Sequence, residues 1–166
     1  LVQIPANTVP GYNVYGQLVA DAAGAAYVIG LEATSTAYPM IGQGATIYLN
    51  TDQNAATGFS PSWAASAVGA EYAVVFEANA NGDLQPYLYA ATSAGVGAVK
   101  LNGGQPLSWA ASANKNGLEI AIPQALLPTN GAAPHGINFG FLINGGPLPS
   151  FATSPLYAIA DPASVV

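Results

Sequence analysis

The sequence predicts an all-β fold of the sandwich or barrel type, and two observations support this prediction. Short runs rich in Val, Ile, Tyr and Phe recur along the chain, and clusters of turn-forming residues separate them. Nineteen glycines and thirteen prolines interrupt the longer segments, which leaves little room for helices. The length of 166 residues fits one domain, and no linker divides the sequence. We therefore expect a single β domain over residues 1–166.

Nine segments are expected to form strands, because each combines β-branched or aromatic residues with a turn signal at its end. These segments are 12–20, 26–31, 45–50, 72–76, 84–91, 96–101, 118–122, 137–143 and 156–159. The pair Asn81-Gly82, which favours a tight hairpin turn, separates the fourth segment from the fifth. Little helix is expected beyond one turn at 124–127, directly after Pro123.

The charge content excludes several classes of function. Charged residues make up 6% of the chain, against about 25% in an average domain. Two lysines, no arginine and eight acidic residues give a net charge of -6, so the basic surface that nucleic-acid binding requires is missing. The absence of cysteine excludes disulfides, thiolate metal sites and cysteine nucleophiles. No run of about 20 apolar residues is present, so we expect no transmembrane helix.

The same composition bears on where the protein acts. A surface low in charge and poor in lysine, in a chain without cysteine, is what we expect of a secreted or cell-surface protein of bacterial type. Residues 1–5 lack the basic start and the apolar run of a signal peptide. We therefore expect the chain to be a mature protein or a piece excised from a longer secreted one.

One hexapeptide, Ser-Trp-Ala-Ala-Ser-Ala, occurs twice, at 62–67 and at 108–113. Each copy precedes a segment with the pattern Gly-x-Glu. One interpretation is a pair of equivalent hairpin entries, each with its tryptophan packed over the edge of the core. The other interpretation makes Trp63 and Trp109 exposed aromatic platforms for sugar rings, and hence candidate ligand-binding residues.

Three oxygen-bearing side chains, Asn50, Asp52 and Asn54, lie two residues apart at the end of a predicted strand. The period of a strand directs such side chains to one side, and calcium binds six to eight oxygen ligands of this kind. An EF-hand is rejected, because its sixth position is Ala55 instead of glycine and its twelfth is Pro61 instead of glutamate. The alternative is a turn in which Asn and Asp cap the backbone without any metal.

The segment 47–59, with Thr57-Gly58-Phe59 at its end, is followed by Gly69-Ala70-Glu71-Tyr72. This order resembles the family 9 carbohydrate-binding-like modules and the related DOMON domains, which are β-sandwich modules of secreted bacterial proteins. The likeness covers about residues 25–145. It implies an antiparallel, jelly-roll-like β-sandwich and a structural calcium ion, with Thr57 and Glu71 joining the three Asx residues as ligands. Asn50 stands where an aspartate is common in the family, which removes one negative charge.

Catalysis is not expected. His135 is the single histidine, and no nucleophile elbow accompanies the serines. A glycosidase needs two carboxylates on either side of one bond, and the sequence context distinguishes none of Glu71, Glu77 and Glu119. Solvated strand positions explain Glu71 and Glu119 equally well.

Two functions follow as expectations. The first is a calcium-stabilised binding module that recognises carbohydrate or another cell-surface polymer. The alternative is a structural subunit of an extracellular filament, sheath or adhesin, which self-associates through its strand edges. The apolar ends at 1–5 and 164–166 would then pair with the open edge of a neighbour.

Overall fold

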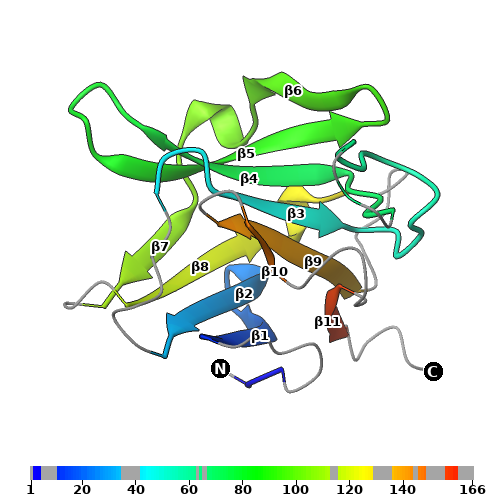
Figure 1. Cartoon of the computed structure of the whole chain (residues 1–166). Helices are drawn as coiled ribbons and strands as arrows, with labels where there is room; N and C mark the ends of the chain where they lie inside the picture. Colours follow the sequence, from blue (N-terminus) through cyan, green and yellow to red (C-terminus); the bar gives the residue numbers. More distant parts are fainter. Residues whose placement is uncertain are drawn as a thin grey trace.

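The chain folds into two antiparallel β-sheets packed face to face, as a computed structural model of the whole chain shows (Figure 1). The structure describes residues 2–4, 11–34, 42–62, 64, 67–112, 116–128, 136–143, 146–148 and 156–160. Within this part of the chain, no helix has the length and apolar character that a membrane span requires. The prediction of an all-β, antiparallel sandwich is confirmed.

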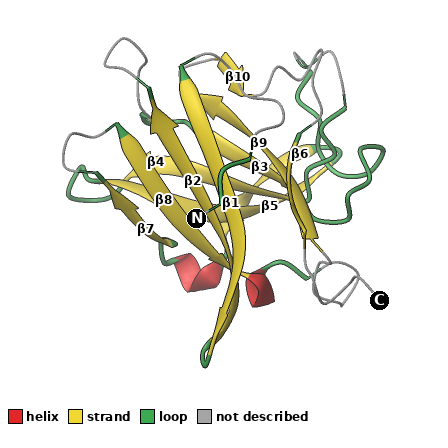
Figure 2. Cartoon of the chain, turned by 90° about the horizontal axis from the view of Figure 1, so that it is seen from below, coloured by secondary structure: helices red, strands yellow, loops and turns green. Residues whose placement is uncertain are grey.

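The smaller sheet has four strands in the order β1-β2-β8-β7 (Figure 2). Their bounds are Tyr12–Asp21 for β1, Gly24–Ala33 for β2, Gly117–Pro123 for β8 and Ser108–Ala111 for β7. Residues 2–4 lie along the free side of β1, where the N–H of Gly16 donates to the carbonyl of Val2 at 2.9 Å. This N-terminal segment therefore pairs within its own chain on that side.

The larger sheet has the order β10-β9-β3-β4-β5-β6, and β11 pairs with the other end of β9. The bounds are Thr46–Asn50 for β3, Tyr72–Ala78 for β4, Leu84–Thr92 for β5, Gly95–Lys100 for β6, Gly136–Ile143 for β9, Gly146–Leu148 for β10 and Tyr157–Ala160 for β11. Two short 3₁₀ turns complete the fold, η1 at Asn102–Gly104 and η2 at Gln124–Leu126. The second of these is the single turn that the sequence predicts after Pro123.

Two strands, β7 and β10, were not expected from the sequence. β7 has four residues, two of them alanine, and alanine has a low preference for strands. β10 has only three residues and includes Pro147, which cannot donate a ladder hydrogen bond. The pairing that makes them strands comes from β8 and β9, which lie elsewhere in the sequence.

The core lies between the two sheets and follows the alternation of strand side chains. In β8, Leu118, Ile120 and Ile122 are buried, whereas Glu119 between them is exposed. Phe139, Phe141 and Tyr157 pack together in this core, which also contains the buried rings of Tyr27 and Phe76. Burial of this apolar surface is the main contribution to folding.

A second, smaller apolar cluster lies on the outer face of the larger sheet. It joins Tyr48 and Ala73 of the sheet to Val68 and Ala70, with Phe59 packed against them. The chain between β3 and β4 therefore covers part of this face. The outer face of the smaller sheet is hollowed instead.

The two copies of the repeated hexapeptide are not equivalent. Residues 108–111 of the second copy form β7 in the smaller sheet. The described residues of the first copy, Ser62, Ala64 and Ala67, belong to no strand, and Ala64 packs on the second cluster. The expectation of two equivalent hairpin entries fails for the described residues, because those of the first copy belong to no strand whereas residues 108–111 of the second form β7.

Candidate functional site

The loop of residues 51–59 follows β3 and is tied back to the start of β4. Phe59 and Ala70 exchange two backbone hydrogen bonds of 2.7 and 2.9 Å. The hydroxyl of Ser60 accepts the N–H groups of Val68 and Gly69 at 2.8 and 3.0 Å. These bonds hold the loop close to Glu71, although about twelve residues separate the two in sequence.

Two glycines make this close approach sterically feasible. Gly58 has φ of 73° and Gly69 has φ of 68°, values that L-residues with a side chain rarely adopt. A Cβ atom on Gly58 would lie 2.4 Å from the carbonyl oxygen of Ala70, and one on Gly69 would lie 2.6 Å from that of Asn54. Both positions therefore require glycine, and both belong to the motif that carries the family resemblance.

The side chains of Asp52, Thr57 and Glu71 converge at the base of this loop. The Thr57 hydroxyl contacts Asp52 Oδ2 in a short hydrogen bond and lies 3.3 Å from Glu71 Oε1 and 3.0 Å from the carbonyl oxygen of Asn54. One hydroxyl carries one proton, so it can donate to only one of these three acceptors at a time. Three acceptor oxygens therefore surround a hydroxyl that can donate to only one of them.

In the described part of the chain, no basic side chain pairs with the Asp52 and Glu71 carboxylates. Burial raises the pKa of the Glu71 carboxyl, and the charge of Asp52 raises it further. Hydrogen bonds from the backbone N–H groups of Thr51 (2.7 Å) and Asp52 (3.4 Å) act in the opposite direction. Lys100, the single basic residue that the structure describes, is engaged elsewhere with Glu77 at 3.7 Å.

This donor set fits a hard cation. Two carboxylates and one backbone carbonyl lie within 3.3 Å of one hydroxyl oxygen, and calcium accepts all three types of oxygen. No three His, Cys, Asp or Glu side chains gather anywhere among the residues described, so the site has only two charged ligands. A low ligand charge predicts weak binding, as in extracellular calcium modules with Kd of about 10⁻⁴–10⁻³ M.

Asn50 lies apart from this group in its contacts. It is the last residue of β3, is 1% exposed, and donates from Nδ2 to the carbonyl of Val68 at 3.1 Å. Its Oδ1 is buried and has no hydrogen-bond partner among the described residues. Buried acceptors without partners are rare in proteins and are commonly satisfied by a water molecule or an ion. Its assignment as a metal ligand stays a prediction.

Asp52 and Asn54 also build the turn that the alternative interpretation describes. Asp52 Oδ1 accepts the N–H of Asn54 at 2.8 Å, and Asn54 Oδ1 accepts the N–H of Ala56 at 3.0 Å. These are the local side-chain caps that favour Asx residues in loops. The turn and a cation site are compatible, because Asp52 Oδ2 and the Asn54 carbonyl face Thr57 at the same time.

Of the two tryptophans, Trp63 lies outside the described residues. Trp109, on β7, is half-buried, packs edge-on against Phe76 with a centroid distance of 5.6 Å, and donates from Nε1 to Gln85 Oε1 at 3.2 Å. It thus bridges the two sheets, as the core-edge interpretation predicts. Sugar binding by Trp109 stays a prediction that would depend on the exposed part of its ring.

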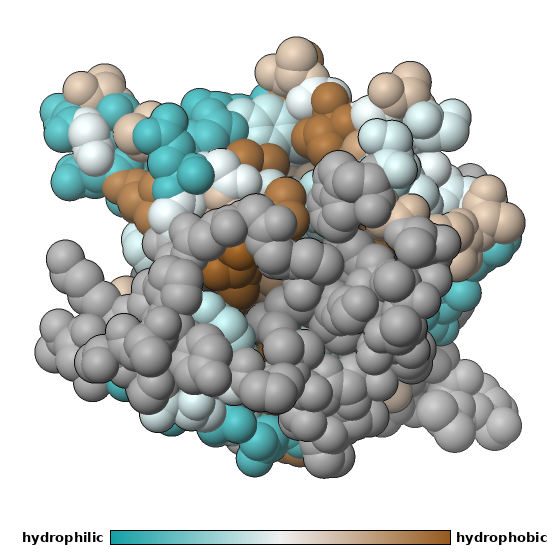
Figure 3. Space-filling view, in the orientation of Figure 1, coloured by the Kyte–Doolittle hydropathy of each residue, from teal (hydrophilic) through white to brown (hydrophobic). Residues whose placement is uncertain are grey.

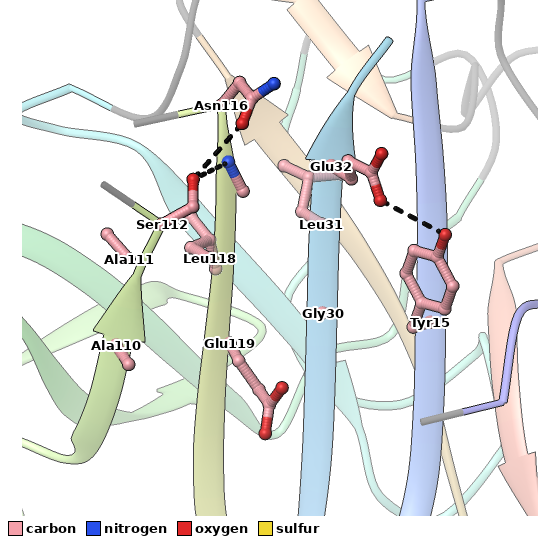
Figure 4. Close-up of a pocket in the computed structure, with 11 residues that line it drawn as sticks. Tyr15, Gly30, Leu31, Glu32, Ala110, Ala111, Ser112, Asn116, Leu118 and Glu119 are labelled. Atoms are coloured by element: carbon pink, nitrogen blue, oxygen red, sulfur yellow. Dashed lines mark hydrogen bonds between the residues drawn. The ribbon is translucent and has the colours of Figure 1, made fainter. Parts of the chain in front are cut away.

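A cleft of about 470 Å³ crosses the outer face of the smaller sheet (Figure 4). Each of the four strands contributes to it. It is lined by Tyr15, Gly30, Leu31, Glu32, Ala110, Ala111, Ser112, Asn116, Gly117, Leu118 and Glu119.

Hydrogen bonds order the polar residues of the cleft. The Tyr15 hydroxyl donates to Glu32 Oε2 at 3.3 Å across β1 and β2. On the opposite side of the cleft, Ser112 Oγ accepts the N–H of Gly117 at 2.9 Å and donates to Asn116 Oδ1 at 3.2 Å. Sequence reasoning missed Tyr15 and Glu32. Their alternation with the buried Val14 and Leu31 marks them as outward-facing, but only the strand order places them beside Glu119.

No protein-family model, curated protein or solved structure matches the chain. What is established is therefore a two-sheet, all-β sandwich without a family assignment.

Proposed function

We propose that this chain is a non-catalytic, extracellular binding module that holds a structural calcium ion in the 51–59 loop and recognises carbohydrate or related cell-surface material. The observation that carries the calcium part is the convergence of Asp52, Glu71 and the Asn54 carbonyl on one threonine hydroxyl. A cation would neutralise both carboxylates and engage the acceptors that the hydroxyl proton cannot serve. The ion would act as a clamp between the loop and β4.

The family resemblance supports the same proposal. The likeness to family 9 carbohydrate-binding-like modules lies in the Thr-Gly-aromatic and Gly-Ala-Glu segments. Their glycines, Gly58 and Gly69, occupy positions where a side chain would collide with backbone. The motif thus has a structural role in bringing the loop against Glu71, which is what a clamp requires.

The absence of catalysis is part of the proposal. Glu32 and Glu119 share the cleft, but both are exposed to solvent. The general acid of a glycosidase typically lies in an apolar pocket, whereas these two carboxylates lie in solvent. His135 lies outside the described residues. We expect no release of reducing ends when the protein is incubated with polysaccharides.

Calcium is expected to raise the melting temperature of the chain after treatment with EDTA. A ligand that binds only the folded state at about 100 times its Kd stabilises by about 2.7 kcal/mol, which for a site of this charge calls for about 10–100 mM calcium. In a chain of this size that corresponds to a rise of about 5–10 °C. Differential scanning calorimetry of the EDTA-treated chain, with and without added CaCl₂, measures the shift.

The matched variants are Asp52→Asn and Asp83→Asn. Both remove one negative charge, but Asp83 lies in the exposed turn between β4 and β5. The calcium shift should be lost in the first variant and kept in the second. An unchanged melting temperature in the wild type, or an equal shift in both variants, contradicts the calcium site.

A second candidate function, self-assembly, is favoured by β6. This strand ends the larger sheet, and its side chains are mostly exposed, with Val99 at 75% and Val96 at 37%. Hydrophobic atoms reach the surface along the top of Figure 3, where β6 lies in Figure 1. An exposed apolar edge strand is a template for pairing with another chain.

If the chain assembles in this way, Val99→Lys is expected to abolish association, because a charged side chain would be placed in the new contact. Val19→Lys, at an exposed valine of the other sheet, is the control and should assemble like the wild type. Sedimentation velocity over a concentration series measures the association of the wild type and of both variants. A wild-type chain that stays monomeric at millimolar concentration contradicts the assembly function.

A further inference from the structure

We propose that the cleft on the outer face of β1, β2, β8 and β7 binds one uncharged polysaccharide chain laid along β2. The inference rests on the proposed function for its ligand class, carbohydrate.

The centre of the cleft is a row of residues across four strands. Tyr15 pairs with Gly30, Gly30 with Glu119, and Glu119 with Ala110. Side chains at paired positions lie on the same face of a sheet, so Tyr15 and Glu119 stand on either side of a residue without a side chain. The result is a hollow between a phenol ring and a carboxylate, as Figure 4 shows.

A second hollow of about 270 Å³ continues along the same strands. Val28 and Ala121 line it, and each lies two positions from a residue of the first hollow, Gly30 on β2 and Glu119 on β8. A spacing of two keeps all four on one face. From Glu32 to Gly24, β2 covers eight steps of about 3.3 Å, or about 26 Å. The track is long enough for a chain of sugar units.

The floor of this track suits a flat ligand. Between its ends, the outward-facing positions of β2, β8 and β7 carry glycine or small apolar side chains: Gly30, Val28, Ala26, Ala110 and Ala121. Leu31 and Leu118 also line the first hollow, and Val19 and Pro123 line the second. Tyr15 stands at its side, and its hydroxyl is held by Glu32 at 3.3 Å. An aromatic ring beside a smooth apolar floor offers surfaces to the C–H faces of pyranose rings.

The charges select the kind of glycan. Glu32 and Glu119 are hydrogen-bond acceptors at one end of the track, and Asp21 lies at the other. Sugar hydroxyls are donors, and their bonds to carboxylates are stronger than bonds between neutral groups. No lysine or arginine lines either hollow among the described residues, so sulfated and uronate-rich glycans would be repelled.

A basic peptide segment is the competing occupant, because two carboxylates also attract cations. Exposed ion pairs contribute little, about 0–1 kcal/mol, and salt screens them. A ligand held mainly by charge would therefore bind weakly at physiological ionic strength. The long uncharged floor favours the glycan.

The test is isothermal titration of the chain with soluble neutral glucans, xylans, mannans and galactans, followed by a length series of the glycan that binds. Affinity is expected to rise at least about tenfold from disaccharide to hexasaccharide, because the longer chain reaches the second hollow. Glu119→Ala should weaken binding about tenfold or more, as expected for loss of hydrogen bonds to a charged group. Tyr15→Ala should have a similar effect, whereas Tyr15→Phe keeps the ring and most of the affinity. Asp83→Ala, an acidic residue in the β4–β5 turn, should bind like the wild type.

Circular dichroism melts of each variant separate loss of binding from loss of folding. If a neutral glycan binds wild type, Glu119→Ala and Tyr15→Ala equally, the cleft assignment is wrong while carbohydrate binding stands. If none of the neutral chains binds, or if a lysine-rich peptide competes and about 0.5 M NaCl removes all binding, the glycan proposal is wrong. These glycan titrations are independent of the calcium melting experiment, which tests only the proposed ion between the 51–59 loop and β4.

Discussion

Replacing Gly58 by alanine is expected to destabilise the fold by about 2–4 kcal/mol and to remove its response to calcium. The backbone at Gly58 has φ of 73°, and strain of this kind costs about 1–3 kcal/mol in a residue with a side chain. The new Cβ would also lie 2.4 Å from the Ala70 carbonyl oxygen and 2.7 Å from Glu71 Oε1. Because Ala70 is backbone-paired with Phe59, relief of the clash must push the loop away from β4.

Gly82→Ala is the matched control. Gly82 has a similar φ of 82°, but nothing lies within 4 Å of the position that a Cβ would occupy. The backbone strain is therefore shared and the collision is not, so this variant should lose only about 1–2 kcal/mol. Urea denaturation of both variants, with and without calcium, gives the two free energies of unfolding. Equal losses would show that the loop does not press against β4 as the structure describes.

Phe139→Ala is expected to cost about 3–5 kcal/mol, the range for truncating a fully buried phenylalanine. Phe139 has no exposed surface, and its ring lies 5.7 Å from that of Phe141 and 5.5 Å from that of Tyr157. It sits on β9 between β3 and β11, so the cavity would open where three strands meet. The melting temperature should fall by about 2–4 °C for each kcal/mol lost.

Phe59→Ala removes the same side chain from the second apolar cluster. Phe59 is only half-buried, on the outer face of the larger sheet, with its ring 6.2 Å from that of Tyr48. We expect the free energy of unfolding to fall by about 1–2 kcal/mol, because folding buries less apolar area at Phe59 than at Phe139. A loss equal to that of Phe139→Ala would mean that the covering loop belongs to the main cooperative core.

The sequence was most informative where strand alternation and turn chemistry agree. The β4–β5 hairpin follows directly from two β-rich runs around Asn81-Gly82, and in the structure Ala78 pairs with Leu84 across that turn. All nine predicted strands are present. The two that were missed, β7 and β10, have weak local preference and exist because a neighbour pairs with them.

The candidate sites also differ in whether neighbouring residues of the chain or distant ones form them. The loop was found from sequence because Asn50, Asp52 and Asn54 are close together in the chain, although the structure separates the contacts of Asn50 from those of Asp52. The repeated hexapeptide was a poor guide to structure, because the described residues of its two copies lie in different environments. The cleft could not be predicted from the sequence, because residues that line it, such as Tyr15 and Glu119, lie about a hundred positions apart in the chain.

The sequence by itself determined that this protein is all-β and acidic, and it located the Asx-rich loop, because these properties depend on composition and on neighbours along the chain. The tertiary structure decided that Glu71 meets Asp52 through Thr57, that Trp109 bridges the sheets, and that Tyr15 and Glu32 share a face with Glu119. The physical reason is that strand alternation fixes the face of each side chain, whereas strand order depends on the packing of the two sheets. β2 and β8 become neighbours only when their inward faces are buried together, and the cleft appears on the side that this leaves in water.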